Sequence, residues 1–279
     1  MITRVVFNQK GGVGKSSITV NLAAISAQQG YRTLVIDLDP QSNSSQYILG
    51  SSHHDPDDLP TFSPNIYHFF EEVLGNNQSK GLIGSAIGSL LSSKPKGLEA
   101  VIHQSPFPNL HVIPASPELG SLEHALESKH KIYKLRDAIQ KLAASYDRIY
   151  IDTPPAFNFF TLSALITAHK VLIPFDCDVF SHRALLTLLE NVMETRQDHN
   201  DELSVEGVIV NQFQSQAKLP REIVEQLKQD NLPVFENMLP PSVIMKESHL
   251  KNLPLIHLAT DHKLTQTYLA LFKEIEKKA

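Results

Sequence analysis

The stretch FNQKGGVGKSS, from Phe7 to Ser17, decides the fold. A short apolar run, ITRVV, precedes it, and a helical pattern, SSITVNLAAISAQQ, follows it. The common phosphate-binding loop reads G-x-x-x-x-G-K-[ST] and therefore has a glycine five residues before its second glycine. Here Gln9 stands at that position, and an additional lysine, Lys10, comes next. The stretch therefore resembles a phosphate loop that carries two lysines, Lys10 and Lys15.

The glycines of this loop suit a phosphate chain. Gly11, Gly12 and Gly14 allow backbone N–H groups to approach an anion without a Cβ in the way. The helix that follows presents unpaired amides and the positive end of its dipole. Lys15 is expected to reach the β- and γ-phosphates of a nucleotide, and the Ser16 hydroxyl to coordinate Mg²⁺. The alternative is a glycine-rich surface turn, and the flanking strand and helix argue against it.

Beyond the loop, short runs rich in β-branched residues alternate with helical patterns. The runs 32–40, 110–116, 147–155, 170–177 and 205–213 predict strands, and the stretches 131–146, 181–198 and 220–230 predict helices. Apolar strands separated by helices indicate an α/β fold, a doubly wound and mainly parallel β-sheet with helices on both faces. Ligands of such sheets bind beyond the carboxyl ends of the strands.

Residues 51–109 interrupt this alternation. They are rich in Ser, Pro, Gly, Asn and His, and they hold two short helix candidates at 65–75 and 81–91. Because the segment lacks the strands needed for a core, we expect one domain over 1–279 with an elaborated connection at 51–109. The cluster HHDPDD at 53–58 is better explained as a solvated turn than as a metal site.

Composition limits the function classes. Of the 279 residues, 42% are apolar and 20% are charged, which is typical of a soluble globular protein. The net charge of −5 means that any binding to nucleic acid needs a local basic patch. Cys177 is the only cysteine, so a disulfide or a Cys-ligated cluster within one chain is excluded. With no signal-peptide pattern and no bilayer-spanning run, a cytoplasmic protein is expected.

Three acidic residues stand at the ends of predicted strands. Asp37 and Asp39 lie two positions apart, so both are expected to share one face and to point at the nucleotide. Asp152 follows a mostly apolar run. A buried carboxylate needs a partner, and beside a phosphate loop a ligand role is favoured over a capping role. Asp152 then resembles a Walker-B-type acid that holds Mg²⁺ through water.

The motifs KGGVGKS, DLDPQSN and DTPP, in this order, resemble the ParA/MinD group of deviant-Walker ATPases. The DPQ-x-N pattern and the run NLHVIPAS are similar to the ParA (Soj) type, which segregates DNA. The resemblance covers nearly the whole chain and is weakest over 51–109. It implies a P-loop NTPase fold of the SIMIBI kind that binds ATP and Mg²⁺ and hydrolyses ATP slowly.

The resemblance also implies roles for matching residues. Lys10 matches the signature lysine, which reaches across a dimer to the partner's nucleotide, and Lys15 matches the phosphate-loop lysine. Asp39 matches the acid that orients the attacking water, and Asn211 matches an asparagine that reads adenine. The implied nucleotide contacts are Lys10, Gly11, Gly12, Val13, Gly14, Lys15, Ser16, Ser17, Asn211, Pro240 and Pro241, and the implied metal site is Ser16, Asp37 and Asp152.

One position departs from the pattern. Many relatives have an arginine after the first proline of the MLPPS loop, and here Pro241 stands there. The family's DNA-binding arginines therefore do not carry over directly. The remaining basic candidates are Lys218, Arg221, Lys228, Lys246 and Lys251. Acidic residues are interspersed among them (Glu222, Glu225, Glu247), so a DNA-contacting face and a solvated mixed-charge surface are equal alternatives.

The leading hypothesis is an ATP-dependent homodimer that binds DNA nonspecifically on the nucleoid. It would segregate or position a plasmid, a chromosome or a protein body, and a ParB-like or other adaptor protein would stimulate hydrolysis. The alternative is a metabolic ATP-dependent ligase of the same fold. A membrane anchor of the MinD kind is not expected, because the apolar stripe of 264–275 is better explained by packing on the sheet.

Overall fold

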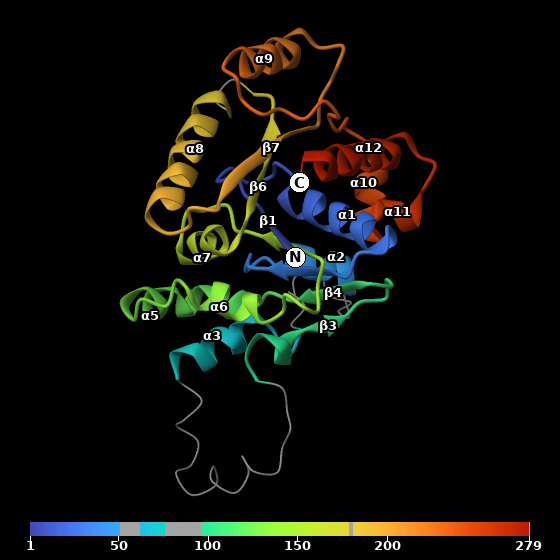
Figure 1. Cartoon of the computed structure of the whole chain (residues 1–279). Coiled ribbons are helices and arrows are strands. Elements are labelled where there is room, and N and C mark those ends of the chain that lie inside the picture. Colours follow the sequence, from blue (N-terminus) through green and yellow to red (C-terminus); the bar gives the residue numbers. More distant parts are fainter. Residues whose placement is uncertain (51–61, 76–95, 179–180, 279) are drawn as a thin grey trace, which may run out of the picture.

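The computed structural model describes residues 1–50, 62–75, 96–178 and 181–278. Its centre is a seven-stranded sheet in the order β3-β4-β2-β5-β1-β6-β7 (Figure 1). The parallel strands are β1 (Ile2–Val6), β2 (Thr33–Asp37), β4 (Leu110–Ile113), β5 (Arg148–Asp152), β6 (Lys170–Asp176) and β7 (Ser204–Asn211). At one edge, β3 (His103–Gln104) pairs antiparallel with β4. The predicted mainly parallel sheet is confirmed.

Helices cover both faces of the sheet (Figure 1). One face packs against α1 (Lys15–Gln28), α2 (Asn43–Leu49), α11 (Leu255–Leu258) and α12 (Lys263–Lys278). The other packs against α3 (Ile66–Leu74), α5 (Glu123–Ser128), α6 (Lys134–Gln140), α7 (Phe159–Thr167), α8 (Ser181–Asp198) and α9 (Lys218–Gln229). The helix α10 (Val243–Leu250) precedes α11.

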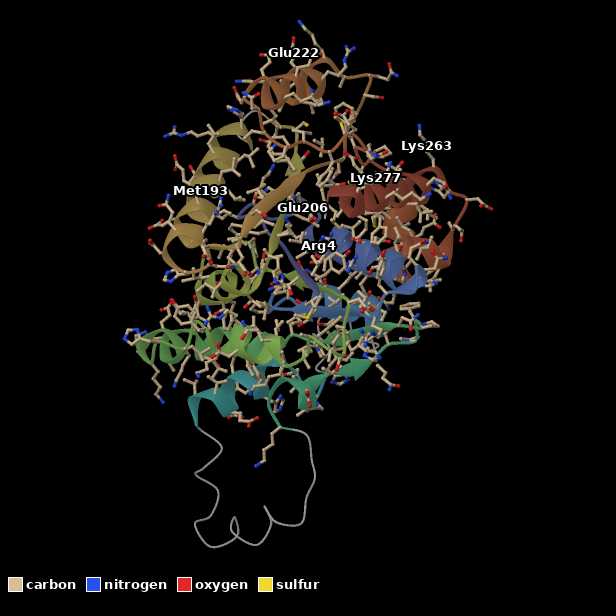
Figure 2. The ribbon with its side chains drawn as sticks, viewed as in Figure 1. Arg4, Met193, Glu206, Glu222, Lys263 and Lys277 are labelled. Carbon is tan, nitrogen blue, oxygen red and sulfur yellow. The ribbon has the colours of Figure 1, made fainter. Side chains whose placement is uncertain are left out.

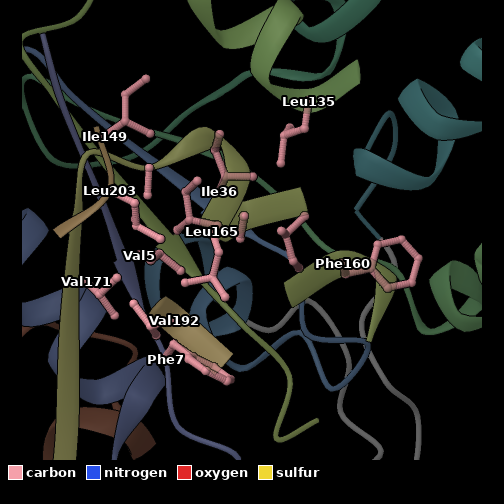
Figure 3. Close-up of a cluster of buried hydrophobic side chains, with 14 of the residues drawn as sticks. Val5, Phe7, Ile36, Leu135, Ile149, Phe160, Leu165, Val171, Val192 and Leu203 are labelled. Atoms are coloured by element: carbon pink, nitrogen blue, oxygen red, sulfur yellow. The ribbon is translucent and has the colours of Figure 1, made fainter. Parts of the chain in front are cut away.

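The strands are apolar on both sides because both sides are covered. Val5 and Ile36 belong to the core cluster on the α7 and α8 side, and Figure 3 shows Val5 near Phe7, with Ile36 and Phe160 in the same cluster. The next residue along β1, Val6, belongs to the cluster on the α1 and α12 side. This double burial explains why the strands read as continuous apolar runs and not as alternating ones.

Three parts of the sequence prediction need comment. The helix expected over 131–146 is shorter, because α6 ends at Gln140 and the chain tightens into turns with i to i+3 hydrogen bonds, such as Leu142 N to Ile139 O at 2.9 Å. Within 51–109, the first helix candidate is α3, and β3 is a strand that the sequence did not predict. The second candidate at 81–91 and the HHDPDD cluster lie outside the described residues.

A buried ion network ties α12 to the sheet. Arg4 of β1 is fully buried. Its guanidinium donates two hydrogen bonds to Glu206 of β7, from Nε to Oε2 at 2.7 Å and from Nη2 to Oε1 at 3.0 Å. Its Nη1 lies 2.9 Å from Oε1 of Glu276 on α12. Figure 2 labels Arg4 and Glu206 in the interior of the molecule. Arg4 therefore compensates the buried Glu206 and shares Glu276, which is partly exposed, with Arg148.

Replacing Arg4 by methionine should lower the free energy of unfolding by about 3 kcal/mol, because the buried Glu206 loses the cation that compensates its charge, whereas Glu276 keeps its pair with Arg148. Urea unfolding near neutral pH measures this loss. Adding Glu206→Gln to the Arg4→Met variant should recover part of it. As a matched control, Arg32→Met breaks the exposed pair with Asp147 and should cost far less. An Arg4→Met variant as stable as the wild type would contradict this account.

Candidate functional site

The turn between β1 and α1 has the geometry of a phosphate loop. Gly12 and Gly14 adopt φ of 77° and 91°, in the left-handed region that favours glycine. The helix α1 begins at Lys15, and no side chain caps its first amides. Those amides are therefore available to an anion at the positive end of the helix dipole. The predicted strand, glycine turn and helix are confirmed.

Two connected hollows lie over this loop. The first, which we also call the phosphate hollow, has a volume of about 510 Å³ and is lined by Gly11, Gly12, Gly14, Lys15, Ser16, Ser17, Asp39, Gln41, Asn43, Gln46, Tyr47, Pro155, His249 and Asn252. The second, of about 620 Å³, shares Gly12, Gly14, Ser17 and His249 with it and adds Asn211, Gln212, Pro240, Pro241, Ser242, Val243, Met245, Lys246, Leu264 and Tyr268. A hollow with loop amides and charges beside a more apolar one suits a phosphate chain and a flat base.

Lys15 lies inside the first hollow. Lys15 is only 7% exposed, and its Nζ donates a hydrogen bond to the carbonyl oxygen of Lys10 at 3.2 Å. Burial lowers the pKa of Lys15, while the nearby Asp152 and Asp39 oppose that shift. A desolvated ammonium group gains from an anionic ligand, so its place at the loop fits a phosphate.

Asp152, at the end of β5, is fully buried. Its Oδ2 accepts a hydrogen bond from Ser44 Oγ at 2.7 Å, and its Oδ1 has no hydrogen-bond partner within the described chain. Burial raises the pKa of Asp152 to about 6, and the neighbouring Ser16 and Ser44 hydroxyls oppose that rise. An unpaired carboxylate oxygen near Ser16 is chemically suited to Mg²⁺, which is typically held by one or two carboxylates together with nucleotide phosphates and water.

No cluster of three or more His, Cys, Asp or Glu side chains that would hold a metal by itself occurs in the ranges described above. A metal at this site would therefore depend on Ser16, Asp152 and the phosphates of the nucleotide. This is the ligand set expected for a nucleotide-bound Mg²⁺.

Asp37 and Asp39 face different surroundings. Asp37 is fully buried: Ser45 donates to its Oδ2 from N at 2.9 Å and from Oγ at 2.6 Å, and Asp39 N donates to its Oδ1 at 3.1 Å. Asp39 lines the first hollow and accepts from Gln41 N at 3.0 Å. Since β2 ends at Asp37, strand alternation does not govern Asp39. Asp37 is not among the residues that line the first hollow, and burial together with the nearby Asp152 carboxyl raises its pKa. Its shared face with Asp39 and its role near the metal stay predictions.

Lys10 pairs with acidic residues at the end of β6 and just after it. It is not among the residues that line the phosphate hollow of its own chain, and its ammonium pairs with Asp178 and lies 3.7 Å from Oδ2 of Asp176. The hydrogen bond with Asp178 is the main cause of a raised pKa for Lys10. Asn8 Oδ1 also accepts a hydrogen bond from Lys10 N at 2.8 Å. Lys10 and Lys15 therefore occupy separate environments, although they belong to one loop.

Asn211, at the end of β7, lines the second hollow beside the phosphate loop. Its Nδ2 donates to the carbonyl oxygen of Val13 at 2.9 Å. A Cβ added to Gly14 would lie 2.4 Å from the same nitrogen, so a glycine is needed there for space as well as for φ. Pro240 and Pro241 line the second hollow together with Asn211. The structure thus brings together the three residues that the sequence assigned to the base.

The candidate DNA-contacting residues are exposed, and acids lie among them. Lys218, Arg221 and Lys228 belong to α9, Lys246 to α10, and Lys251 follows α10. Lys218 Nζ is 3.5 Å from a carboxylate oxygen of Glu222, and Lys228 Nζ is 2.8 Å from one of Glu236. Figure 2 shows Glu222 on the outer side of α9. Lys218 and Lys228 therefore lie on a surface of mixed charge, and a DNA-binding role for the five basic residues stays a prediction.

Sequence reasoning missed His249, Tyr47 and the acidic partners of Lys10. His249 lines both hollows, and its Nε2 lies 2.9 Å from Ser17 Oγ. The two residues are 232 positions apart, and only the return of α10 over α1 brings them together. Tyr47 follows the DPQ-x-N motif closely, which is the one local signal that could have marked it.

Comparisons with known proteins agree with the motifs. A family model described as an AAA domain matches residues 1–205. The chain is 33% identical to the chromosome partitioning protein ParA of Myxococcus xanthus, over 98% of this chain and 87% of that protein. Apo McdA of Cyanothece has a similar fold, with a TM-score of 0.77, 20% identity, and coverage of 100% of this chain and 99% of that chain.

A further solved structure, cobyrinic acid a,c-diamide synthase from Mycobacterium smegmatis with a bound ATP analog and magnesium, has a TM-score of 0.73 and 24% identity, and the match covers 99% of this chain and 93% of that chain. At this identity the likeness shows the fold alone. Separately, a search of the described helices finds no segment with the length and apolar character needed to cross a membrane. The loop, the ordered motifs and the relatives converge, and the chain belongs to the ParA/MinD family of P-loop ATPases with a deviant Walker loop.

Proposed function

We propose that this chain is a ParA-type switch, in which ATP joins two copies into a dimer and hydrolysis separates them. The observation that carries this proposal is the division of labour in the loop. Lys15 is buried in the phosphate hollow of its own chain, whereas Lys10 lies outside that hollow. A second chain would supply the nucleotide that Lys10 reaches, once its pair with Asp178 has opened. The similarity to a chromosome partitioning protein supports the same reading.

Each chain would use its own residues in separate roles. The loop amides and Lys15 hold the phosphates, and Asn211 with the proline loop holds the base. Asp39 positions the attacking water at the first hollow. When Mg²⁺ is bound by Ser16 and Asp152, it neutralises charge that develops on the phosphates. A site assembled in this way hydrolyses ATP slowly unless a partner protein completes it. Slow hydrolysis under the control of a partner suits a switch better than a metabolic enzyme.

The proposed dimer binds DNA nonspecifically and stays with the nucleoid in the cytoplasm. A ParB-like or other adaptor protein would connect it to its cargo and stimulate hydrolysis. Because the whole chain has a net charge of −5, the DNA contact must come from a few well-placed lysines on a mildly acidic body. Such contacts are lost steeply as salt rises, since they release counterions from the phosphate backbone.

DNA binding measured with ATP, ADP, a slowly hydrolysed ATP analogue or no nucleotide, across a salt series, tests this function. We expect binding with ATP and the analogue only, and a steep decrease with salt. Lys251→Glu should weaken binding, whereas Lys263→Glu makes the same charge change on α12 and serves as the matched control (Figure 2). DNA binding that is equal in all nucleotide states would contradict the switch.

A metabolic ATP-dependent ligase is the second candidate, because the diamide synthase shares this fold. Such an enzyme would consume a small carboxylate substrate. A small-molecule acceptor that raises phosphate release stoichiometrically would favour it over the switch.

A further inference from the structure

His249 lies where the two hollows of the site meet. It lines both of them, as Gly12, Gly14 and Ser17 do, and its Nε2 is 2.9 Å from Ser17 Oγ. The phosphate loop lines the first hollow, and Asn211 lines the second. A nucleotide with its phosphates in one hollow and its base in the other must pass its sugar and α-phosphate beside His249.

The imidazole ring is held in place by three helices. It stands edge-on to Tyr47 of α2, with ring centroids 4.8 Å apart and planes at 88°. Tyr47 is only 4% exposed, and its hydroxyl accepts from Asn21 Nδ2 at 3.1 Å and also bonds to Ser248, the neighbour of His249 on α10. Asn21 Oδ1 accepts from Leu255 N at 2.9 Å, which fixes the chain beyond α10. The ring is therefore positioned before any ligand arrives, which favours binding.

We propose that His249 is a further nucleotide-binding residue, which donates a hydrogen bond to the α-phosphate of ATP or ADP beside Ser17. The proposal rests on the proposed nucleotide site and adds a ligand to it. Ser17 Oγ and His249 Nε2 are already close enough to share one phosphate oxygen. A protonated imidazole donates from both ring nitrogens, and a hydrogen bond from a cation to a phosphate is among the strong ones.

Nucleotide binding and protonation of this ring are thereby coupled. His249 is exposed as a whole residue, but the partial burial of its ring lowers its pKa, so the ring is mainly neutral at neutral pH before the nucleotide binds. A phosphate beside it favours the charged form and raises the pKa in the complex. The complex then holds more protons than the unliganded protein, so affinity rises as pH falls.

Other titratable groups line the two hollows, namely Lys15, Asp39, Tyr47, Lys246 and Tyr268. Burial raises the pKa values of both tyrosines, so these stay neutral in the range where His249 titrates. All five groups remain when His249 alone is replaced. The difference between the wild type and a His249 variant therefore isolates the imidazole from these groups and from the titration of the nucleotide itself.

Calorimetric titration with Mg–ADP and with a slowly hydrolysed ATP analogue, between about pH 6 and 8, tests the proposal on the wild type and the His249→Gln variant. We expect the variant to bind both nucleotides about tenfold more weakly at the acid end, with a smaller difference at the alkaline end. The matched control is His257→Gln. His257 stacks on Phe107 at 4.6 Å, burial lowers its pKa too, and it lines neither hollow.

The NMR titration of His249 in the wild-type chain gives a second measurement, in which its pKa should rise when Mg–ADP is added. Equal affinities of the wild type and His249→Gln at every pH, or an unchanged pKa of His249, would overturn the proposal. A loss confined to the ATP analogue would overturn the assignment to the α-phosphate. The Lys15→Ala variant separates a wrong nucleotide site from a wrong role for His249. If Lys15→Ala and His249→Gln both bind nucleotide like the wild type, the proposed nucleotide site is wrong. If Lys15→Ala loses binding and His249→Gln does not, only the proposed role of His249 is wrong.

Discussion

Replacing Lys15 by alanine should abolish the binding of ATP and ADP. Lys15 is the cation buried in the phosphate hollow, and Asp39 and Asp152 lie close enough to influence its pKa. Without the ammonium group, the phosphates would lose their charge-assisted hydrogen bonds and would meet two carboxylates instead. Because each such bond contributes about 1.5–3 kcal/mol, we expect affinity to fall by about a hundredfold or more.

Calorimetry with both nucleotides measures this loss, and thermal unfolding without nucleotide checks that the Lys15→Ala variant is folded. The matched control is Lys10→Ala, which removes a lysine of the same loop. Lys10 pairs with Asp178 outside the hollow, so its variant should still bind ATP as a monomer but should fail to form the ATP-dependent dimer. Tight ATP binding by Lys15→Ala would remove the phosphate-loop assignment.

The contrast between these two lysines shows how far the sequence alone can go. The loop follows from local signals: an apolar run before it, glycines where φ is positive, and a helix that begins at Lys15. These signals act within about 20 residues, and the mainly parallel sheet then follows from the alternation of apolar runs and helices. The environment of Lys10 needs Asp176 and Asp178 at the end of β6, which only the pairing of β6 with β1 brings near.

The same limit explains the other differences. Strand alternation does not reach Asp39, because β2 ends at Asp37, so the shared face expected for these two acids stays a prediction. Asn211 and Pro240 were identified through resemblance, and the structure places them in one hollow with the loop. His249 had no local signal, because its position depends on α10 returning over α1. Patterns within one element are readable in a sequence, whereas contacts between distant elements require the folded chain.

Replacing Asp39 by alanine should leave ATP-dependent dimers intact and reduce ATP turnover by about 10²–10⁴-fold, the range lost when a positioned acid–base group is removed. Asp39 is 6% exposed and lines the first hollow, and Gln41 N holds one of its oxygens at 3.0 Å. Burial raises the pKa of Asp39, although the Gln41 amide and Lys15 oppose that rise. A carboxylate with a raised pKa is a better proton acceptor for an attacking water than an exposed one.

Phosphate release measures turnover in the Asp39→Ala variant, and size-exclusion chromatography with ATP measures dimer formation. Asp137→Ala is the matched control, since it removes a partly exposed carboxylate of α6 that pairs with Lys134 and lines neither hollow. That control should hydrolyse ATP at close to the wild-type rate. Normal hydrolysis by Asp39→Ala would remove Asp39 from the mechanism. Loss of the dimer together with turnover would instead mean that the carboxylate acts in nucleotide binding, before the water is positioned.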